Sequence, residues 1–429
     1  MLTQDATVEK LLKDSFLKFL RDTDSAHGLI KDKTAPDWPA SIAVIGLALS
    51  AYPVGVERGF MSRAEAGERT LRTLRFLWNS PQNEQPDATG YKGFFYHFLD
   101  MKTGRRAWQC ELSTIDTGLL FLGALTSREY FDRITQDEHE IRMLADALYL
   151  RADWQWALNG GLSLTHGWKP ESGFLNFRWE GYNEALLLYL LGLGSPTFPL
   201  PLNSYATWAS SYTWIEYGGL EYLYSGPLFT HQLPHVWIDF RGIKDTFMRD
   251  KGIDYFENSR RATFAQQKYA INNPLDFTGY GANCWGITAS DGPGPKTMKV
   301  NGIERQFFGY MGRGIPYGPD DGTLAPWAVV TSLPFAPEIV LPTIEYAIHE
   351  IKVVAPDAYC FKASFNPTYP TESLNSNGWV SPWLYGIDQG PIILMIENYQ
   401  TGLLWQLIRR CPYIVKGLLR AGFKGGWLS

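Results

Sequence analysis

The sequence predicts an all-α protein whose helices close into a toroid, with long aromatic-rich loops gathered at one end. Three observations lead to this fold class. Apolar residues recur with the helical period along most of the chain. Several expected helices are apolar on more than one face, which is typical of helices inside a helical assembly. Long segments rich in glycine, proline and aromatic residues separate them, and loops of such length are usually functional.

The expected helices follow one another along the chain. The apolar stripe of the first consists of Leu11, Leu12, Phe16, Phe19 and Leu20. Ser62 and Glu65 have the spacing of a capping box, which begins a second helix that runs to about Asn79. Further helices are expected over residues 114–125, 138–158, 181–193, 255–269, 338–353 and 403–408. About a dozen helices, counting shorter ones between these, are enough to close a toroid.

Five long segments separate these helices. They cover residues 81–106, 159–180, 196–226, 273–324 and 356–383. Two of them are expected to hold β-hairpins, one from 94–99 returning after residues 103–104 and one from 162–166 returning through 173–177. The competing architecture, a (β/α)8 barrel, needs repeated strands rich in valine and isoleucine. Only residues 42–45 and 392–396 approach that pattern, so we expect a single toroidal domain over residues 1–429.

The composition excludes several classes of function. The chain has 429 residues, 45% of them hydrophobic and 19% charged, which is far from a disordered composition. Its net charge of −5 argues against a nucleic-acid-binding protein, because such a protein needs a basic face. No apolar run approaches the roughly 20 residues of a membrane span. We therefore expect neither a nucleic-acid partner nor a membrane partner.

The N-terminus and the cysteines bear on location. Residues 1–9 contain no basic n-region and no apolar h-region, so we expect a cytoplasmic protein for the sequence as it stands, or a periplasmic one if a leader has been removed. The four cysteines stand far apart, with no C-x-x-C pair, at Cys110, Cys284, Cys360 and Cys411. This spacing favours buried free thiols over disulfides or a zinc site.

The candidate catalytic residues are carboxylates in apolar or aromatic surroundings, where burial raises one pKa while another group stays ionised. Asp116 stands at the start of an apolar helix, and a first-turn aspartate that interacts with the helix dipole is the alternative. Glu184 opens a helix so apolar that its carboxylate needs a cavity to meet water. Asp388 precedes a further apolar run, where capping is the alternative.

Other chemistries find less support in the sequence. Sixteen tryptophans, many near polar residues, suit stacking on sugar rings, although an aromatic core gives the same count. Asp239 lies two residues before Arg241, and a structural ion pair is the favoured interpretation. His231 and His235 are four residues apart but lack the glutamate of a zinc-protease helix, so we expect no metal and no cofactor. No nucleophile elbow, P-loop or dinucleotide fingerprint occurs in its required context.

Short strings of aromatic, acidic and glycine residues carry a resemblance to a known family. In chain order they are Gly93-Phe-Phe-Tyr-His-Phe-Leu-Asp with Thr103-Gly104, Glu111-Leu-Ser-Thr-Ile-Asp-Thr, Tyr182-Asn-Glu, Leu228-Phe-Thr-His-Gln, His235-Val-Trp-Ile-Asp-Phe-Arg-Gly, Asp254-Tyr-Phe-Glu-Asn-Ser, Trp285-Gly-Ile-Thr-Ala-Ser-Asp-Gly-Pro, Ser332-Leu-Pro-Phe-Ala-Pro-Glu and Asp388-Gln-Gly-Pro. From about Asp14 to Trp405, the chain resembles the glycoamylase-like domain of bacterial β-1,2-glucanases.

The resemblance implies an (α/α)6 toroid that hydrolyses linear β-1,2-glucan or its oligosaccharides with inversion. It also implies three acidic positions in a cleft, which fall on Asp116, Glu184 and Asp388. Glu184 is then the general acid, Asp388 the base that activates water, and Asp116 orders the site or binds the sugar at the cleavage point. An inverting pair of carboxylates is separated by about 6.5–9.5 Å so that water fits between them.

The same strings supply the expected substrate contacts. These are Glu111, Tyr182, His235, Trp237, Asp239, Arg241 and Trp285. The expected partner is a β-glucan or a gluco-oligosaccharide. Three alternatives stay open: a transglycosylase, as in the similar domain attached to cyclic-glucan synthases, a hydrolase of another β-glucan linkage, and a non-catalytic glucan-binding protein. The last predicts that one of the three acids is missing, and all three are present.

Overall fold

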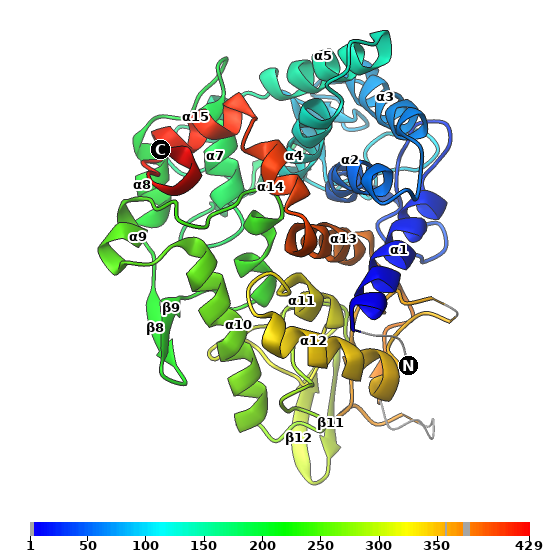
Figure 1. The fold of residues 1–429 in the computed structure, drawn as a ribbon, viewed down its shortest axis with the longest axis vertical. Helices are drawn as coiled ribbons and strands as arrows, with labels where there is room; N and C mark the ends of the chain where they lie inside the picture. The colour runs from blue at the N-terminus through cyan, green and yellow to red at the C-terminus, as the bar shows by residue number, and fades with distance from the viewer. Residues whose placement is uncertain (1–3, 357, 372–377) are drawn as a thin grey trace. The chain divides into compact units, whose positions relative to one another are not determined.

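The computed structural model describes residues 4–356, 358–371 and 378–429, and Figure 1 shows its helices and strands. The chain folds into two compact units, each assembled from three separate segments. The first unit comprises Met1–Lys18, Thr213–Leu233 and Phe256–Gln400. The second comprises Phe19–Tyr212, Pro234–Tyr255 and Thr401–Ser429. The single domain over residues 1–429 stays a prediction.

Helices dominate the second unit, and short strands accompany them. Its α-helices are α2 (Ile42–Glu57), α3 (Arg63–Asn79), α4 (Thr114–Tyr130), α5 (Gln136–Leu150), α6 (Trp154–Ala157), α7 (Leu186–Gly194), α8 (Asn203–Ala209), α9 (Thr246–Lys251), α14 (Leu403–Ile408) and α15 (Pro412–Arg420). Its strands are β1 (Ala40–Ser41), β2 (Gly90–Tyr91), β3 (Phe94–Tyr96), β4 (Phe98–Leu99), β5 (Leu112–Ser113), β6 (Gly167–Lys169) and β7 (Gly173–Phe174). Short 3-10 helices lie at η2 (Leu233–Val236) and η4 (Gly426–Leu428).

The first unit combines helices with two-stranded ribbons. Its helices are α1 (Gln4–Asp22, which continues into the second unit), the 3-10 helix η1 (Leu228–His231), α10 (Tyr255–Asn272), α11 (Pro326–Thr331), α12 (Pro337–Tyr346), the π-helix η3 (Ala347–Ile351) and α13 (Gly386–Gln400). Its strands are β8 (Trp214–Tyr217), β9 (Leu220–Leu223), β10 (Ala289–Ser290), β11 (Lys296–Val300), β12 (Ile303–Phe307), β13 (Met311–Gly312), β14 (Phe365–Asn366) and β15 (Trp379–Val380).

The core of the second unit is built on the close contact of α2 with α4. A Cβ atom added at Gly46 would lie 2.3 Å from the carbonyl oxygen of Leu119, and one added at Gly123 would lie 2.0 Å from the carbonyl oxygen of Gly46. Only glycine leaves room for two backbones at this separation. Residues 42–55 of α2 are buried on every face. The prediction that such helices lie inside a helical assembly is confirmed.

Several helices begin or end away from their predicted bounds, for local reasons. Ser62 caps α3 as expected, because its side chain accepts a hydrogen bond from the Glu65 backbone N–H. The helix expected over 138–158 is interrupted after Leu150, and Asp153 caps the short α6 through the Trp156 N–H at 2.9 Å. The helix expected over 338–353 changes to a π-helix at Ala347.

A five-stranded antiparallel sheet in the order β2-β3-β5-β6-β7 includes strands from both regions where hairpins were expected. The second hairpin is confirmed, with its strands β6 and β7 nearer the turn than predicted and an isolated bridge between Thr165 and Arg178. The first differs: β4 leaves the sheet to pair with β1, and only Leu99 bridges back to Arg106. In this arrangement β3 and β5 lie side by side, and β5 leads into α4.

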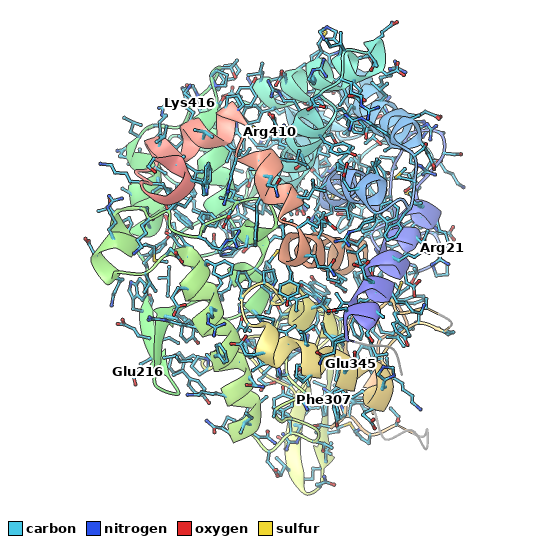
Figure 2. The ribbon with its side chains drawn as sticks, viewed as in Figure 1. Arg21, Glu216, Phe307, Glu345, Arg410 and Lys416 are labelled. Carbon is cyan, nitrogen blue, oxygen red and sulfur yellow. The ribbon has the colours of Figure 1, made fainter. Side chains whose placement is uncertain are left out.

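Three further features concern the exposed charged residues, the cysteines and the length of the apolar helices. Charged side chains such as those of Glu216, Arg410 and Lys416 are exposed (Figure 2). The four cysteines are free and buried, as predicted. Among the described residues, no helix is both long enough and apolar enough to cross a membrane.

Candidate active site

The best-defined part of the candidate site lies in the second unit, where β5 leads into α4. Ser113 ends β5 and is the N-cap of α4. Its hydroxyl accepts a hydrogen bond from the Asp116 backbone N–H at 3.2 Å and donates one to Asp116 Oδ2 at 2.5 Å. Asp116 is therefore fixed in the first turn of α4, where the helix dipole favours a negative charge.

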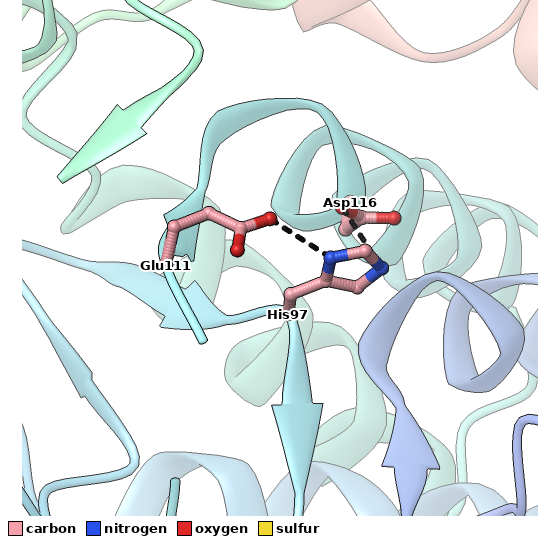
Figure 3. A group of neighbouring side chains, drawn as sticks. All are labelled: His97, Glu111 and Asp116. Carbon is pink, nitrogen blue, oxygen red and sulfur yellow. Dashed lines mark hydrogen bonds and ion pairs between the residues drawn. The ribbon is translucent and has the colours of Figure 1, made fainter. Parts of the chain in front are cut away.

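His97 lies between Asp116 and a second carboxylate, Glu111 (Figure 3). The ring Nδ1 is 2.9 Å from Glu111 Oε1, and Nε2 is 3.6 Å from Asp116 Oδ2. On one side the imidazole stacks on the ring of Phe98, with centroids 3.9 Å apart. The side chain of Asp116 remains 14% exposed, so the cluster is accessible to a ligand at that carboxylate.

The pairing of β3 with β5 explains why His97 and Glu111 meet. Tyr96 is opposite Leu112 in an antiparallel pair, so His97, which follows Tyr96, comes opposite Glu111, which precedes Leu112. The backbone N–H of His97 donates to the Glu111 carbonyl at 3.0 Å. The sequence analysis did not identify His97 as a site residue. The pairing register of the two strands would have indicated it, because directly opposite side chains interact across a sheet.

Opposite charges determine the protonation of this cluster. Burial favours the neutral ring of His97, but the charge of Asp116 together with the hydrogen bond and charge of Glu111 outweighs it and raises the pKa of His97 to about 9. Burial also acts on Glu111, but its hydrogen bond with His97 prevails and lowers the pKa of this carboxyl. At neutral pH the cluster therefore holds an imidazolium cation and an ionised Glu111.

A further carboxylate, Asp32, interacts electrostatically with the same histidine. Its side chain is buried and accepts a hydrogen bond from Trp38 Nε1 at 3.1 Å. Burial raises the pKa of Asp32 more than His97, Trp38 and Lys33 lower it. The sequence analysis also missed this residue, since nothing in its local sequence distinguishes it from a surface aspartate.

The same cluster has the donor atoms of a metal site. His97, Glu111 and Asp116 each offer one ligand atom, and within the described part of the chain these three atoms lie within 4.8 Å of one another. A metal ion needs a neutral imidazole, whereas the raised pKa of His97 keeps its ring protonated at neutral pH. A metal ion bound here would have to displace that proton, and the expectation of no metal stays a prediction.

Glu184 lies just before α7, in the same unit as Asp116. The predicted helix begins late because Asn183 Oδ1 accepts a hydrogen bond from the Ala185 N–H at 3.0 Å, a local bond that competes with the helical pattern. The side chain of Glu184 is half-buried. Burial, with a further contribution from the charge of Asp116, raises the pKa of Glu184 to about 7.

Asp388 belongs to the first unit, where it is buried in the first turn of α13. The neighbouring Gln389 fixes this turn: its Oε1 accepts a hydrogen bond from Ser15 at 2.9 Å, and its Nε2 donates to the Phe361 carbonyl at 3.0 Å. The run 392–396, which approached a strand pattern in the sequence, lies within α13.

The expected binding residue Tyr182 belongs to an aromatic cluster. Its ring stacks on Tyr255 with centroids 5.8 Å apart and meets Tyr212 edge to face at 5.9 Å. Tyr255 and Tyr205 both donate hydrogen bonds to the buried carboxylate of Asp245. This cluster supports the segment that carries Glu184, two residues beyond Tyr182.

Three other expected binding residues have the contacts of core residues. Trp237 is 0% exposed, and its indole N–H donates to Ser50 Oγ of α2 at 2.9 Å. Trp285 is 2% exposed, and its N–H donates to Thr343 Oγ1 at 3.0 Å. His235 is also buried, and its carbonyl accepts a hydrogen bond from Trp405. This burial favours core packing over sugar stacking for both tryptophans.

Asp239 and Arg241 form the structural ion pair that the sequence favoured. Arg241 donates twice to the Asp239 carboxylate, from Nε and from an η nitrogen, both at 2.7 Å. Arg409 contacts the same carboxylate from the C-terminal segment, and the Trp427 N–H donates to the Asp239 carbonyl at 2.7 Å. The pair thus joins two segments of the second unit, Pro234–Tyr255 and Thr401–Ser429.

Two solved structures are similar to the chain over its whole length. The chain is 31% identical to a "putative glucoamylase" from Bacteroides uniformis, with a TM-score of 0.87 and 100% of both chains covered. It is 26% identical to an endo-β-1,2-glucanase from Chitinophaga pinensis, solved with sophorotriose and glucose, with a TM-score of 0.85 over 100% of both chains. Its fold is therefore the (α/α)6 toroid expected from the sequence.

The family follows from a match along the sequence. Residues 176–412 match the Glycoamylase family, described as "Putative glucoamylase", and the chain belongs to this family. A curated relative, the exo β-1,2-glucooligosaccharide sophorohydrolase (non-reducing end) of Parabacteroides distasonis, is 28% identical over 404 residues. This match covers 87% of the chain and 52% of the relative, so the chain spans about half the length of that protein.

Proposed function

We propose that the chain is an inverting glycoside hydrolase that cleaves β-1,2-glucan or β-1,2-linked gluco-oligosaccharides. The observation that carries this proposal is the carboxyl of Glu184, whose pKa is raised to about 7 by burial and by the charge of Asp116. Support for the substrate class comes from relatives named for β-1,2-glucan hydrolysis, an exo-acting sophorohydrolase and an endo-β-1,2-glucanase.

Glu184 acts as the general acid in this proposal. A carboxyl with a pKa near 7 is partly protonated at neutral pH and can give its proton to the departing glycosidic oxygen, directly or through a hydroxyl or water. The ionised Glu111 in the same unit is held acidic by His97. Inverting glycoside hydrolysis requires such a protonated carboxyl together with a separate ionised carboxylate that activates water.

Asp388 acts as the base that activates water, a role assigned by the resemblance of its sequence string to the family. Asp116 orders the sugar at the cleavage point. Both contacts of Asp116 with His97 and Ser113 fall on Oδ2, which leaves Oδ1 to accept a hydrogen bond from a sugar hydroxyl. His97 is a positioning residue, because its two ring nitrogens face Glu111 and Asp116 and fix their orientation.

Thin-layer chromatography of the products on linear β-1,2-glucan tests this function, with β-1,3- and β-1,4-glucans as controls. We expect cleavage of the β-1,2-linked polymer or its oligosaccharides alone. Release of sophorose only would identify an exo enzyme, and a ladder of products an endo enzyme. Products longer than the substrate would identify a transglycosylase, and cleavage of only a control glucan would contradict the linkage. Cell fractionation would then distinguish a cytoplasmic from a periplasmic location.

A further inference from the structure

Trp108 is an exposed tryptophan on a specifically built turn of the second unit. Its side chain is 57% exposed, although large aromatic side chains are usually mostly buried. Trp108 and Gln109 have φ angles of +53° and +50°, a left-handed conformation that costs side-chain-bearing residues free energy. Strained backbone of this kind is concentrated at functional positions.

Arg106 fixes the backbone of this turn, and its side chain is only 1% exposed. Its guanidinium donates hydrogen bonds to the carbonyl of Gln109 at 2.8 Å and to the carbonyl of Cys110 at 2.6 Å. It also pairs with Glu171 at 2.7 Å. Because these bonds fix the backbone on the C-terminal side of Trp108, the indole is held outward by a rigid support.

Two further aromatic rings support Trp108 from the side. Trp38 meets it edge to face with centroids 4.7 Å apart, and Phe98 lies 5.3 Å from it at a tilted angle. Trp38 is itself fixed by its hydrogen bond to Asp32 and by Lys33, whose Nζ lies 3.9 Å from the centre of its ring. With both rings in contact, the Trp108 side chain still remains 57% exposed to solvent.

This aromatic group is continuous with the candidate site. Phe98 contacts Trp108 and also stacks on the imidazole of His97. His97 in turn contacts Asp116. Asp116, His97, Phe98 and Trp108 therefore form a continuous series of contacts from the candidate site to the exposed indole. All of these residues belong to the second unit.

We propose that Trp108, supported by Trp38 and Phe98, is a stacking platform for a glucosyl residue adjacent to the one bound at Asp116. A pyranose ring presents an apolar face of C–H groups to an indole, while its hydroxyls remain in water, so an exposed and rigid tryptophan binds it at low entropic cost. This inference rests on the proposed function and makes Trp108 the residue that gives preference for longer chains.

The test compares Trp108→Ala and Trp108→Tyr with wild type on β-1,2-gluco-oligosaccharides of increasing length. Trp78→Ala is the matched control, because Trp78 is also exposed, at 41%, and belongs to α3 of the same unit. We expect Trp108→Ala to raise KM about tenfold or more for long oligosaccharides, if sugar stacking resembles base stacking in size. The shortest cleavable substrate should be affected little, and kcat should stay near wild type.

The outcomes separate this inference from the proposed function. Trp108→Tyr, which keeps an aromatic ring, should restore most of the affinity, and Trp78→Ala should leave KM unchanged. A Trp108→Ala enzyme with the KM of wild type at every chain length overturns the platform. If wild type does not hydrolyse these substrates, tryptophan fluorescence titration with the same oligosaccharides still decides: weaker binding by Trp108→Ala supports the platform, and equal binding overturns it.

Discussion

At the scale of the single residue, the proposed acid chemistry depends on Glu184. If its proton reaches the glycosidic oxygen, Glu184→Gln should lower turnover by about 10²–10⁴-fold and leave KM largely unchanged. Glutamine keeps the size of the side chain but donates no acidic proton. Because the pKa of Glu184 is raised to about 7, wild type should lose activity as the pH rises through that value, and the variant should lack this alkaline limb.

The control for this measurement is Glu180→Gln, since Glu180 is an exposed glutamate four residues earlier in the same segment. It should keep wild-type turnover. Aryl glycosides, whose leaving group needs little protonation, should partly rescue Glu184→Gln. A Glu184→Gln enzyme with turnover within about threefold of wild type, against that expected loss, would transfer the acid role to another carboxylate, and Asp116 is the first to test.

His97 gives a second prediction at the residue scale, measured as the pH profile of kcat/KM. Its charge holds the pKa of Glu111 below the ordinary value. In His97→Gln that charge is lost, so Glu111 becomes protonated at higher pH and activity should be lost earlier on the acid side. We expect the acid limb to move upward by about 1 unit, the low end of the effect of a neighbouring charge.

The matched control is His27→Gln, because His27 also pairs with an aspartate, Asp24, at 3.2 Å but lies outside the site. It should leave both limbs in place. A merely structural role for His97 would lower activity at every pH or lower the melting temperature, without moving the acid limb. That result would contradict the positioning role.

The local sequence singled out one candidate residue, and the family strings supplied the other. Glu184 was recognisable because an ionisable residue opens an unusually apolar helix, whereas Asp116 was assigned through its family string, because a first-turn aspartate also has a structural explanation. The sequence analysis missed His97 and Asp32, because the residues with which they form the cluster are not their neighbours in the sequence. For His97 the partner depends on the register of β3 against β5, which local periodicity does not determine.

At the scale of elements, the contact between α2 and α4 depends on glycine. Gly123→Ala would place a methyl group 2.0 Å from the Gly46 carbonyl oxygen, so the helices must separate. We expect a loss of about 1–3 kcal/mol or more in the free energy of unfolding, measured by denaturant titration. Gly281→Ala is the control, because a Cβ there has no neighbour within 4 Å. Equal stability of the two variants would contradict the close packing.

Trp237 tests whether an aromatic residue of a family string belongs to the core or to the substrate site. Its indole packs without exposure and donates to Ser50 of α2. Trp237→Phe should lower stability by about 1–3 kcal/mol, through the lost hydrogen bond to Ser50 and the lost volume, and leave KM near wild type. A raised KM with unchanged melting temperature would instead restore the sugar-stacking role.

Helices with a long apolar periodicity were predictable from the sequence, whereas short strands in hairpins were missed. The apolar runs at 42–45 and 392–396 are helical, because each continues into a longer helix, α2 or α13. The hairpins β8–β9 and β11–β12 were missed inside segments treated as loops. Their turns, Gly218-Gly219 and Asn301-Gly302, have positive φ angles and are strong hairpin signals that the aromatic composition obscured.

At the scale of the whole molecule, the fold came from the order of the family strings and not from helix counting. Helical periodicity predicts an all-α chain, but many arrangements of a dozen helices satisfy it. The ordered strings run through nearly the whole chain, and the comparison structures cover it completely. The two units each combine segments distant in sequence, and no local pattern specifies such long-range assembly.

The central claim, inverting hydrolysis of β-1,2-glucan, is tested most directly by proton NMR of the first products. Linear β-1,2-glucan is mixed with the enzyme, and the anomeric signals of the new reducing ends are followed before mutarotation. Because a single displacement by water inverts the anomeric carbon, we predict that the α-anomer appears first. Initial formation of the β-anomer, or no cleavage of β-1,2-glucan at all, would contradict the account.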